Sequence, residues 1–337
     1  MSDARLTALS RWVAGILDAP ECTLRPASVD ASFRRYFRVV TASGASFIAM
    51  DAPPDKEDCR PYVHVARLMH AVGLNVPEIV AQDLARGFLL ITDLGERLYL
   101  DALDESTVER LYRDAMKALV LLQRGVAAEA AGLPPYDREL LRREMELFGD
   151  WYLGRHLGLA LSGAQQSALD RAFELLAAAA LEQPRVAVHR DYHSRNLLVT
   201  AARNPGILDF QDAVHGPVTY DLVSLLRDCY IAWPRARVEG WVAAYRVRAA
   251  RAGVPVGDDA ARFMRWFDLM GVQRHLKATG IFARLNHRDG KPNYLGDIPR
   301  TLGYVRDVAA RYPELAGLAD LLNQVSPIAA GDPGGSA

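Results

Sequence analysis

Three oxygen-bearing side chains stand at a spacing that suits the chemistry of a bound metal ion. In "HRDYHSRN", Asp191 is followed five residues later by Asn196, and Asp209 stands thirteen residues further on, at the end of the apolar run "GILDF". The turn "NPG" lets the chain double back, so we expect Asn196 and Asp209 to approach each other from adjacent strands. Carboxylate and amide oxygens suit Mg²⁺, which takes one or two protein ligands and fills its octahedron with water and phosphate oxygens. Asp191, one loop away, is then placed to accept or orient the proton of an attacking hydroxyl.

The elements that flank these residues are suited to hold them rigidly. The runs "VAV" and "LLV" on either side of the loop are apolar and rich in β-branched residues, which predicts short buried strands. Each of His189, Asp191 and Asn196 taken alone is explained as a turn cap. Asp191, Asn196 and Asp209 at their spacings, in a strand-loop-strand-turn-strand context, favour the functional interpretation.

The remainder of the chain divides into a strand-rich part and a helix-rich part. "YFRVV" and "SFIAM" are joined by "TASGA", which predicts a hairpin, and a helix from residue 61 ends near Gly73. "FLLITDLGE" predicts a buried strand that runs into a connector. From about residue 103 the pattern is one of long amphipathic helices, including the whole of "RELLRREMELFGDWYLGRHLG". We therefore predict an α+β protein with a small β-rich lobe over 1–94, a larger helical lobe over 95–326 and a loose tail over 327–337.

Composition excludes several classes of protein. The 337 residues are 50% hydrophobic and carry a formal net charge of −1, which argues against disorder and against a nucleic-acid partner. No stretch approaches the roughly 20 apolar residues that span a bilayer, so no membrane association is expected. The cysteines, Cys22, Cys59 and Cys229, are too few and too far apart for a disulfide framework, which favours a reduced, cytoplasmic protein.

The loop motif carries a resemblance to a known superfamily. "HRDYHSRN" fits the kinase catalytic-loop pattern H-R-D-x-x-x-x-N, and "GILDFQDAVHGPVTYDLVSLL" resembles the aminoglycoside phosphotransferase and choline kinase superfamily. The resemblance covers nearly the whole chain in layout. It implies a two-lobed protein-kinase-like fold, ATP and Mg²⁺ as cofactors, catalysis by Asp191 and metal binding by Asn196 and Asp209. It also implies that Asp221 and His189 support the catalytic loop, although Asp221 alone also suits a helix cap before "LVSLL".

A narrower resemblance concerns the acceptor. "DASFRRYFRV", "AMDAPP", "LLITDLGE", "ELFGDWYL" and "GVQRHLKATGIFARL" together resemble the bacterial anomeric sugar kinases. These phosphorylate N-acetylmuramate and N-acetylglucosamine at the C1 hydroxyl in cell-wall recycling. An amino sugar is thus the implied substrate, and no protein partner is implied. The alternatives are a kinase of another small alcohol (an aminoglycoside, choline or homoserine) and a nucleotide-binding pseudokinase.

The chain departs from the kinase pattern at the phosphate-binding lysine. Met50 stands at the expected lysine position in "SFIAMDA", and the following helix has no glutamate to pair with a lysine. We expect Arg34 or Arg35 to supply the missing charge through a bidentate fork, with Ser32 offering a hydroxyl. The alternative is that these arginines are solvated strand residues. The resemblance further implies that the backbone at Thr92, Asp93 and Leu94 meets the adenine edge.

Candidates for the acceptor pocket come from two further segments. "GVQRHLKATGIFARL" places Gln273, Arg274, His275 and Lys277 on about one helical turn, with Arg274 and Lys277 as an i, i+3 pair. Either cation could bind an acceptor carboxylate or form surface ion pairs instead. Other residues are ambiguous in the same way: Trp151 and Tyr152 suit sugar stacking or core packing, and His193 and Arg195 suit substrate contact or bracing of the loop.

Overall fold

The computed structural model describes residues 3–29 and 33–325. Ser32 and the predicted tail 327–337 lie outside these ranges. The chain forms two compact units, of which the first comprises Met1–Val126 and Ser194–Ala213 and the second Ala127–His193 and Val214–Ala337. The first contains the larger sheet and the second is mainly helical, which confirms the predicted α+β class. The lobe boundary near residue 94 stays a prediction.

A five-stranded antiparallel sheet, in the order β1-β2-β3-β5-β4, is the framework of the first unit. Its strands are β1 (Thr23–Val29), β2 (Arg35–Val40), β3 (Ser46–Asp51), β4 (Ile79–Asp83) and β5 (Phe88–Thr92). The hairpin of β2 and β3 is the predicted one, and its turn closes through a bond from the Thr41 N–H to the Ala45 carbonyl of 3.0 Å. The outer strand β1 contains Pro26, and its pairing with β2 shifts register between Pro26 and Ser28.

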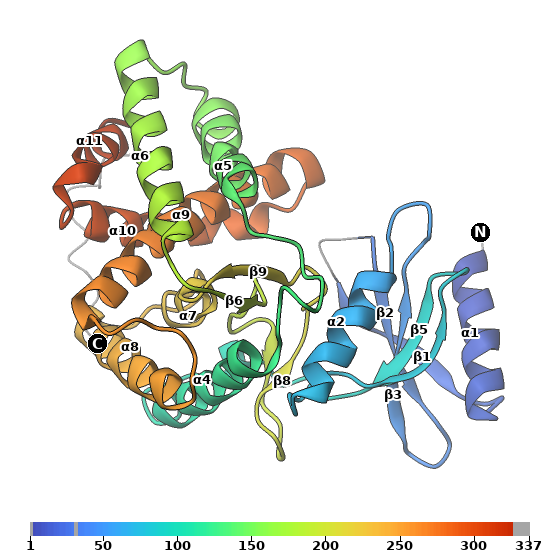
Figure 1. Ribbon diagram of the computed structural model, residues 1–337. Coiled ribbons are helices and arrows are strands. Elements are labelled where there is room, and N and C mark those ends of the chain that lie inside the picture. Colours follow the sequence, from blue (N-terminus) through green and yellow to red (C-terminus); the bar gives the residue numbers. More distant parts are fainter. Residues whose placement is uncertain (1–2, 30–32, 326–337) are drawn as a thin grey trace. The chain divides into compact units, whose positions relative to one another are not determined.

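Helix α1 (Ala4–Leu17) packs on one face of this sheet, as Figure 1 shows at the N-terminal end of the chain. Asp3 caps the helix by accepting the Leu6 N–H at 3.0 Å. The apolar cluster between helix and sheet consists of Leu9, Val13, Phe37, Val39, Ala49, Phe88 and Leu90. Because side chains alternate along a strand, Phe37 and Val39 face α1 together with Arg35, whereas Arg34, Tyr36 and Arg38 face the other way.

The first unit also contains three more helices and a small hairpin. The helices are α2 (Arg60–Ala71), α3 (Tyr99–Ala102) and α4 (Val108–Gly125). As predicted, Gly73 ends α2: its φ is 85°, a left-handed conformation that favours glycine, and its N–H donates to the His70 carbonyl at 2.9 Å. The hairpin pairs β7 (Leu197–Leu198) with β8 (Gly206–Ile207).

The second unit is built around one long helix, α9 (Ala260–Asp289), which Figure 1 shows in orange among the other helices of its unit. Around it lie α5 (Arg138–Leu147), α6 (Gly163–Leu181), α7 (Tyr220–Leu226), α8 (Arg235–Arg251), α10 (Ile298–Ala309) and α11 (Ala316–Val325), together with the 3-10 helices η2 (Pro292–Asp297) and η3 (Pro313–Leu315). Strands β6 (Arg185–Val188) and β9 (Val214–Pro217) form an antiparallel pair.

The single long helix predicted after residue 138 is divided in the structure. α5 ends at Leu147, and residues Phe148–His156 form a π-helix, η1. At this junction α9 approaches so closely that a Cβ on Gly280 would lie 2.3 Å from the Leu147 carbonyl carbon. Only glycine permits that approach, so the packing of α9 against this junction requires the glycine at position 280.

Candidate active site

The loop 189–193 follows β6 and is held by a buried carboxylate. Asp221, in the first turn of α7, accepts the backbone N–H of His189 at 2.6 Å and that of Arg190 at 2.9 Å. Burial raises the pKa of Asp221 to about 7, while these two backbone bonds act in the opposite direction. His189 is buried, and its Nδ1 accepts the Asp191 N–H at 3.2 Å, which places the proton of the neutral ring on Nε2. Asp221 and His189 thus both hold the backbone of the loop through hydrogen bonds.

Asp191 presents its carboxylate at the surface of the second unit. Its side chain is 40% exposed, and the Arg274 guanidinium lies 3.9 Å from it. Desolvation by the surrounding chain raises the pKa of Asp191, but the charges of Lys277, His193 and Arg274 outweigh it and hold the pKa at about 2. Asp191 is therefore an anion at neutral pH that can accept a hydrogen bond from an alcohol.

Arg274 and Lys277, the predicted acceptor cations, lie on α9 beneath this loop. The Arg274 side chain is only 8% exposed, and it donates to the Arg190 carbonyl at 3.3 Å. Lys277 is ion-paired with Glu144 at 2.9 Å and donates to the Tyr220 hydroxyl at 3.1 Å. Both cations thus have partners within the chain. Their contact with an acceptor carboxylate stays a prediction.

The neighbouring candidates on α9 are buried and face other groups. Gln273 donates to the Tyr136 hydroxyl at 3.0 Å. His275 lies 2.8 Å from the Arg227 carbonyl and stacks on Tyr304. Burial lowers the pKa of His275 to about 3, so this ring is neutral. Both residues serve the packing of the second unit.

Glu144 is a buried charged residue that the sequence analysis did not identify. Its carboxylate, on α5, pairs with the Arg190 guanidinium and with Lys277, and it accepts the Tyr136 hydroxyl. Burial raises its pKa, yet the charges of Lys277 and Arg190 hold the pKa below its ordinary value. Glu144 lies on the apolar face of α5 between Leu141 and Met145, and a charge on such a face was the available signal.

Three further candidates, Trp151, Tyr152 and His193, also lie in the second unit. Tyr152 is buried and stacks between Phe148 and His156, at ring distances of 5.4 and 5.8 Å, which is core packing. Trp151 lies under the Arg155 guanidinium at 5.7 Å. The His193 ring meets the Tyr230 ring edge-on at 5.3 Å.

The first unit holds Asn196 and Asp209 together, as predicted. β7 and β8 pair Leu197 with Ile207, and the Asn196 Nδ2 lies 3.4 Å from the Asp209 Oδ2. Asp209 has a φ of 60°, a left-handed conformation that is uncommon outside glycine and concentrates at functional sites. Its Oδ1 accepts the Gln211 Nε2 at 2.9 Å. Arg195, also in this unit, is half-buried.

The donor set of Asn196 and Asp209 fits Mg²⁺. The Asp209 carboxylate and the amide oxygen of Asn196 are hard ligands on residues that flank the paired strands β7 and β8, and Mg²⁺ needs only one or two such groups when phosphate and water complete its shell. Among the residues described, no group of three or more His, Cys, Asp or Glu side chains is arranged to hold a metal ion.

Arg34 and Arg35 have different partners. The Arg34 guanidinium, 11% exposed, lies 3.8 Å from the Asp209 carboxylate. Arg35 faces α1 and pairs with Asp3 and with the buried Asp51, whose other oxygen accepts the Arg5 Nε at 2.9 Å. Of the two predicted phosphate ligands, Arg34 is the one near the metal-binding candidates, and Met50 is buried in the sheet beside its register partners Tyr36 and Leu89.

The connector at residues 92–94 is fixed by a side chain. Asp93 accepts the Arg38 Nε at 2.7 Å, the Ser46 hydroxyl at 2.6 Å and the Gly95 N–H at 2.9 Å. Burial raises the pKa of Asp93, but these bonds outweigh it and hold the pKa below its ordinary value. Thr92 is tied to Glu78, whose N–H donates to the Thr92 hydroxyl at 2.9 Å. The contact between adenine and the backbone at Thr92, Asp93 and Leu94 stays a prediction. The ion pair between Asp93 and Arg38 was not predicted.

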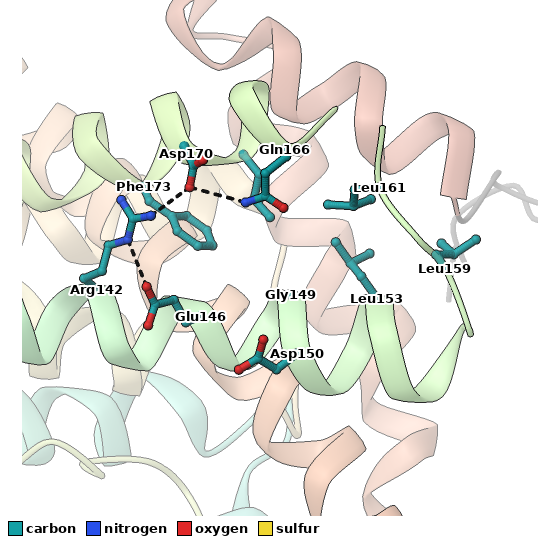
Figure 2. Close-up of a pocket in the computed structure, with 11 residues that line it drawn as sticks. Arg142, Glu146, Gly149, Asp150, Leu153, Leu159, Leu161, Gln166, Asp170 and Phe173 are labelled. Carbon is teal, nitrogen blue, oxygen red and sulfur yellow. Dashed lines mark hydrogen bonds and ion pairs between the residues drawn. The ribbon is translucent and has the colours of Figure 1, made fainter. Parts of the chain in front are cut away.

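A cavity of about 450 Å³ lies in the second unit, between α5, η1 and α6. Figure 2 shows that Arg142 points into it and is bonded to Glu146 and Asp170, which is also contacted by Gln166. None of the predicted site residues lines this cavity. Its one cation is neutralised by carboxylates of the chain, so we do not assign it to the active site.

None of the described helices is both long and apolar enough to cross a membrane.

Known proteins resemble this chain along nearly all of its length. A model of the phosphotransferase enzyme family matches residues 23–263. An N-acetylmuramate/N-acetylglucosamine kinase of Pseudomonas putida is 50% identical over 333 residues, covering 96% of this chain and 97% of that protein. A protein of the same name from Neisseria meningitidis is 44% identical, covering 93% and 94%.

Solved structures resemble the fold at low sequence identity. A choline kinase from Streptococcus pneumoniae superposes with a TM-score of 0.62 at 11% identity, covering 91% of this chain and 99% of that one. The ADP-bound aminoglycoside phosphotransferase APH(2'')-Ib gives a TM-score of 0.60 at 14% identity, covering 91% and 99%. These likenesses show the fold alone and confirm the predicted protein-kinase-like architecture.

Proposed function

Because this chain belongs to the phosphotransferase enzyme family, we propose that it transfers the γ-phosphoryl group of ATP to the anomeric C1 hydroxyl of N-acetylmuramate, N-acetylglucosamine or both. The observation that carries the reaction is the Asn196 amide beside the Asp209 carboxylate on one hairpin. The acceptor comes from the name of relatives that are up to 50% identical over nearly the whole chain. We place the activity in the cytoplasm, in the recycling of cell-wall sugars.

In the proposed reaction the C1 hydroxyl attacks the γ-phosphorus in line, without a phosphoenzyme. The new C1–O–P bond forms as the bond from phosphorus to the β,γ-bridging oxygen breaks, and ADP leaves. Asp191 accepts the hydrogen bond of the attacking hydroxyl and takes its proton. A carboxylate with a pKa near 2 is a weak base, so its main contribution is alignment of the nucleophile, with proton transfer late in the reaction.

The protein groups around the nucleotide are proposed to act by charge and position. When bound, Mg²⁺ would neutralise charge on the phosphates, and Asn196 and Asp209 are the residues that would hold it. Met50 occupies the position where the kinase pattern has a phosphate-binding lysine. Arg34 supplies the missing positive charge, because its guanidinium lies beside Asp209 and can bind phosphate oxygens through two parallel hydrogen bonds.

An acceptor panel tests the substrate. We expect ATP turnover with N-acetylmuramate or N-acetylglucosamine and none with choline or kanamycin. The 1-O-methyl glycoside of N-acetylglucosamine, in which C1 is blocked, should be inert, while the 6-deoxy analogue should react. Turnover of the methyl glycoside would contradict transfer to C1, and turnover of choline or kanamycin alone would contradict the sugar assignment.

Arg34 and Arg35 form a matched pair for testing the phosphate contact. We expect Arg34→Ala to raise the KM for ATP by about 10- to 100-fold, the range for loss of a charge-assisted bond. Arg35→Ala should leave this KM unchanged and lower the Tm instead, because it removes a partner of the buried Asp51. Steady-state kinetics and thermal unfolding of both variants measure this, and an unchanged KM in Arg34→Ala would refute the assignment.

A further inference from the structure

The residue directly before Asp191 has an unusual backbone. Arg190 has a φ of 78°, in the left-handed region where glycine is favoured and a side chain is strained. This conformation is fixed by its neighbours: the Arg190 N–H donates to Asp221 at 2.9 Å, and its carbonyl accepts Ser224 and Arg274, each at 3.3 Å. An arginine in a conformation that favours glycine indicates that its side chain has a specific role.

The Arg190 guanidinium is anchored on Glu144. The Glu144 side chain is 7% exposed, and it binds Lys277 at 2.9 Å as well as the Tyr136 hydroxyl. Tyr136 is itself fixed, because its hydroxyl accepts the Gln273 Nε2 at 3.0 Å. The anchor is therefore rigid and combines groups of α5 and α9 with the segment that precedes α5.

The charges explain why this anchor matters for Asp191. One buried carboxylate, Glu144, lies between two cations, Arg190 and Lys277. These same cations already act on Asp191, since the charge of Lys277 is the strongest of those that lower its pKa. After Glu144, the carboxylate whose charge acts most strongly on both Arg190 and Lys277 is Asp191, so removal of Glu144 would leave both cations to act on Asp191. An Asp191 carboxylate drawn toward them would turn away from an acceptor hydroxyl.

We propose that Glu144 is a positioning residue, which holds Arg190 and Lys277 away from the Asp191 carboxylate and so keeps that carboxylate available to the acceptor. The proposal rests on the proposed role of Asp191. Glu144 does not touch substrate in this account, and its effect passes through Arg190 and Lys277.

Glu144→Gln tests the proposal because it keeps the shape of the side chain and removes its charge. We expect kcat to fall by about 100-fold, the scale of a small misplacement of a reacting group, with the KM for ATP within about twofold of the parent enzyme. Glu146→Gln is the matched control, since Glu146 lies on the same helix, is half exposed and pairs with Arg142 instead. Its kcat should equal that of the parent enzyme.

The double variant Glu144→Gln/Arg190→Gly supplies a second test that depends less on the folding of the first variant. It removes the buried anion together with one of its cations, which is less destabilising than leaving a buried charge unpaired, and glycine relieves the strain at φ 78°. Lys277 still lacks its anion in this variant, whereas the Arg190 cation no longer competes for Asp191. We therefore expect its kcat to lie above that of Glu144→Gln and below that of the parent enzyme.

The outcomes separate this proposal from the proposed function. Full activity in folded Glu144→Gln would overturn it, and if Glu144→Gln did not fold, full activity in the double variant would overturn it, because Lys277 would still lack its anion. A rise in the KM for ATP that matched the fall in kcat would also overturn it, because the effect would not be confined to Asp191. If Asp191→Asn stayed active, the proposed function itself would be contradicted. If Asp191→Asn were inactive while Glu144→Gln stayed active, only the positioning role of Glu144 would be contradicted.

Discussion

Asp191→Asn is expected to lower kcat by about 10³-fold, within the 10² to 10⁴ range of a general acid–base group. Asparagine has the same shape, so the loop held by Asp221 and His189 should keep its structure, but an amide cannot take the proton of the attacking hydroxyl. The KM for ATP should change little. Steady-state kinetics with N-acetylglucosamine, together with thermal unfolding, measure the effect.

The matched control for this variant is Asp150→Asn. Asp150 is an exposed carboxylate of the same unit that lines the cavity in Figure 2, outside the proposed site. It should behave as the parent enzyme does. More than about a tenth of parental kcat in purified, folded Asp191→Asn would remove Asp191 from the mechanism.

The pKa of Asp191 adds a statement about pH. Because its pKa is lowered to about 2, Asp191 stays ionised as the pH falls from about 8 to about 5. Its protonation should therefore produce no loss of kcat in that window. A loss of kcat in that window in the parent enzyme must come from another group, and one such group is Asp221, which accepts two backbone N–H groups of the loop and whose pKa is raised to about 7.

The second large effect is expected for Asp209→Asn. This change removes the only carboxylate of the proposed metal pair and replaces it with an amide, so charge neutralisation at the phosphates is lost. We expect kcat to fall by about 10³-fold, in line with loss of a major electrostatic contact, and the Mg²⁺ concentration for half-maximal rate to rise.

A binding measurement makes this prediction independent of turnover. Titration of Mn²⁺ into the ADP complex, followed by electron paramagnetic resonance, should show weaker metal binding in Asp209→Asn than in the parent. Asp83→Asn is the control, because Asp83 is a carboxylate of the same unit that pairs with Arg86 in the turn after β4. Equal Mn²⁺ affinity in Asp209→Asn and the parent would contradict the metal assignment.

Local features of this protein were predictable from the sequence, and features that depend on distant partners were not. The hairpin of β2 and β3 and the end of α2 at Gly73 follow from residues next to them in the chain. The same holds for Asn196 beside Asp209, because a short hairpin joins them. The change from α-helix to π-helix after Leu147 was not predicted, and no local pattern around Leu147 indicates the close approach of Gly280 to this junction.

The same distinction applies to the charged side chains. Arg34 and Arg35 are adjacent, so the sequence makes them equivalent phosphate-binding candidates. In the structure they differ because Arg34 lies near Asp209 and Arg35 pairs with Asp51, and neither partner is close to them in the sequence. Glu144 and Lys277 were not recognised as partners, since 132 residues lie between them in the sequence. Arg38 and Asp93 were missed for the same reason.

The irregular outer strand β1 bears on how this protein behaves when it is concentrated. A regular strand at the edge of a sheet offers a continuous row of backbone donors and acceptors to any other chain. In β1, Pro26 contributes no N–H, and the shift before Ser28 breaks the spacing of the row. A strand of another molecule could therefore pair with only a short part of β1, which disfavours aggregation through this edge of the sheet.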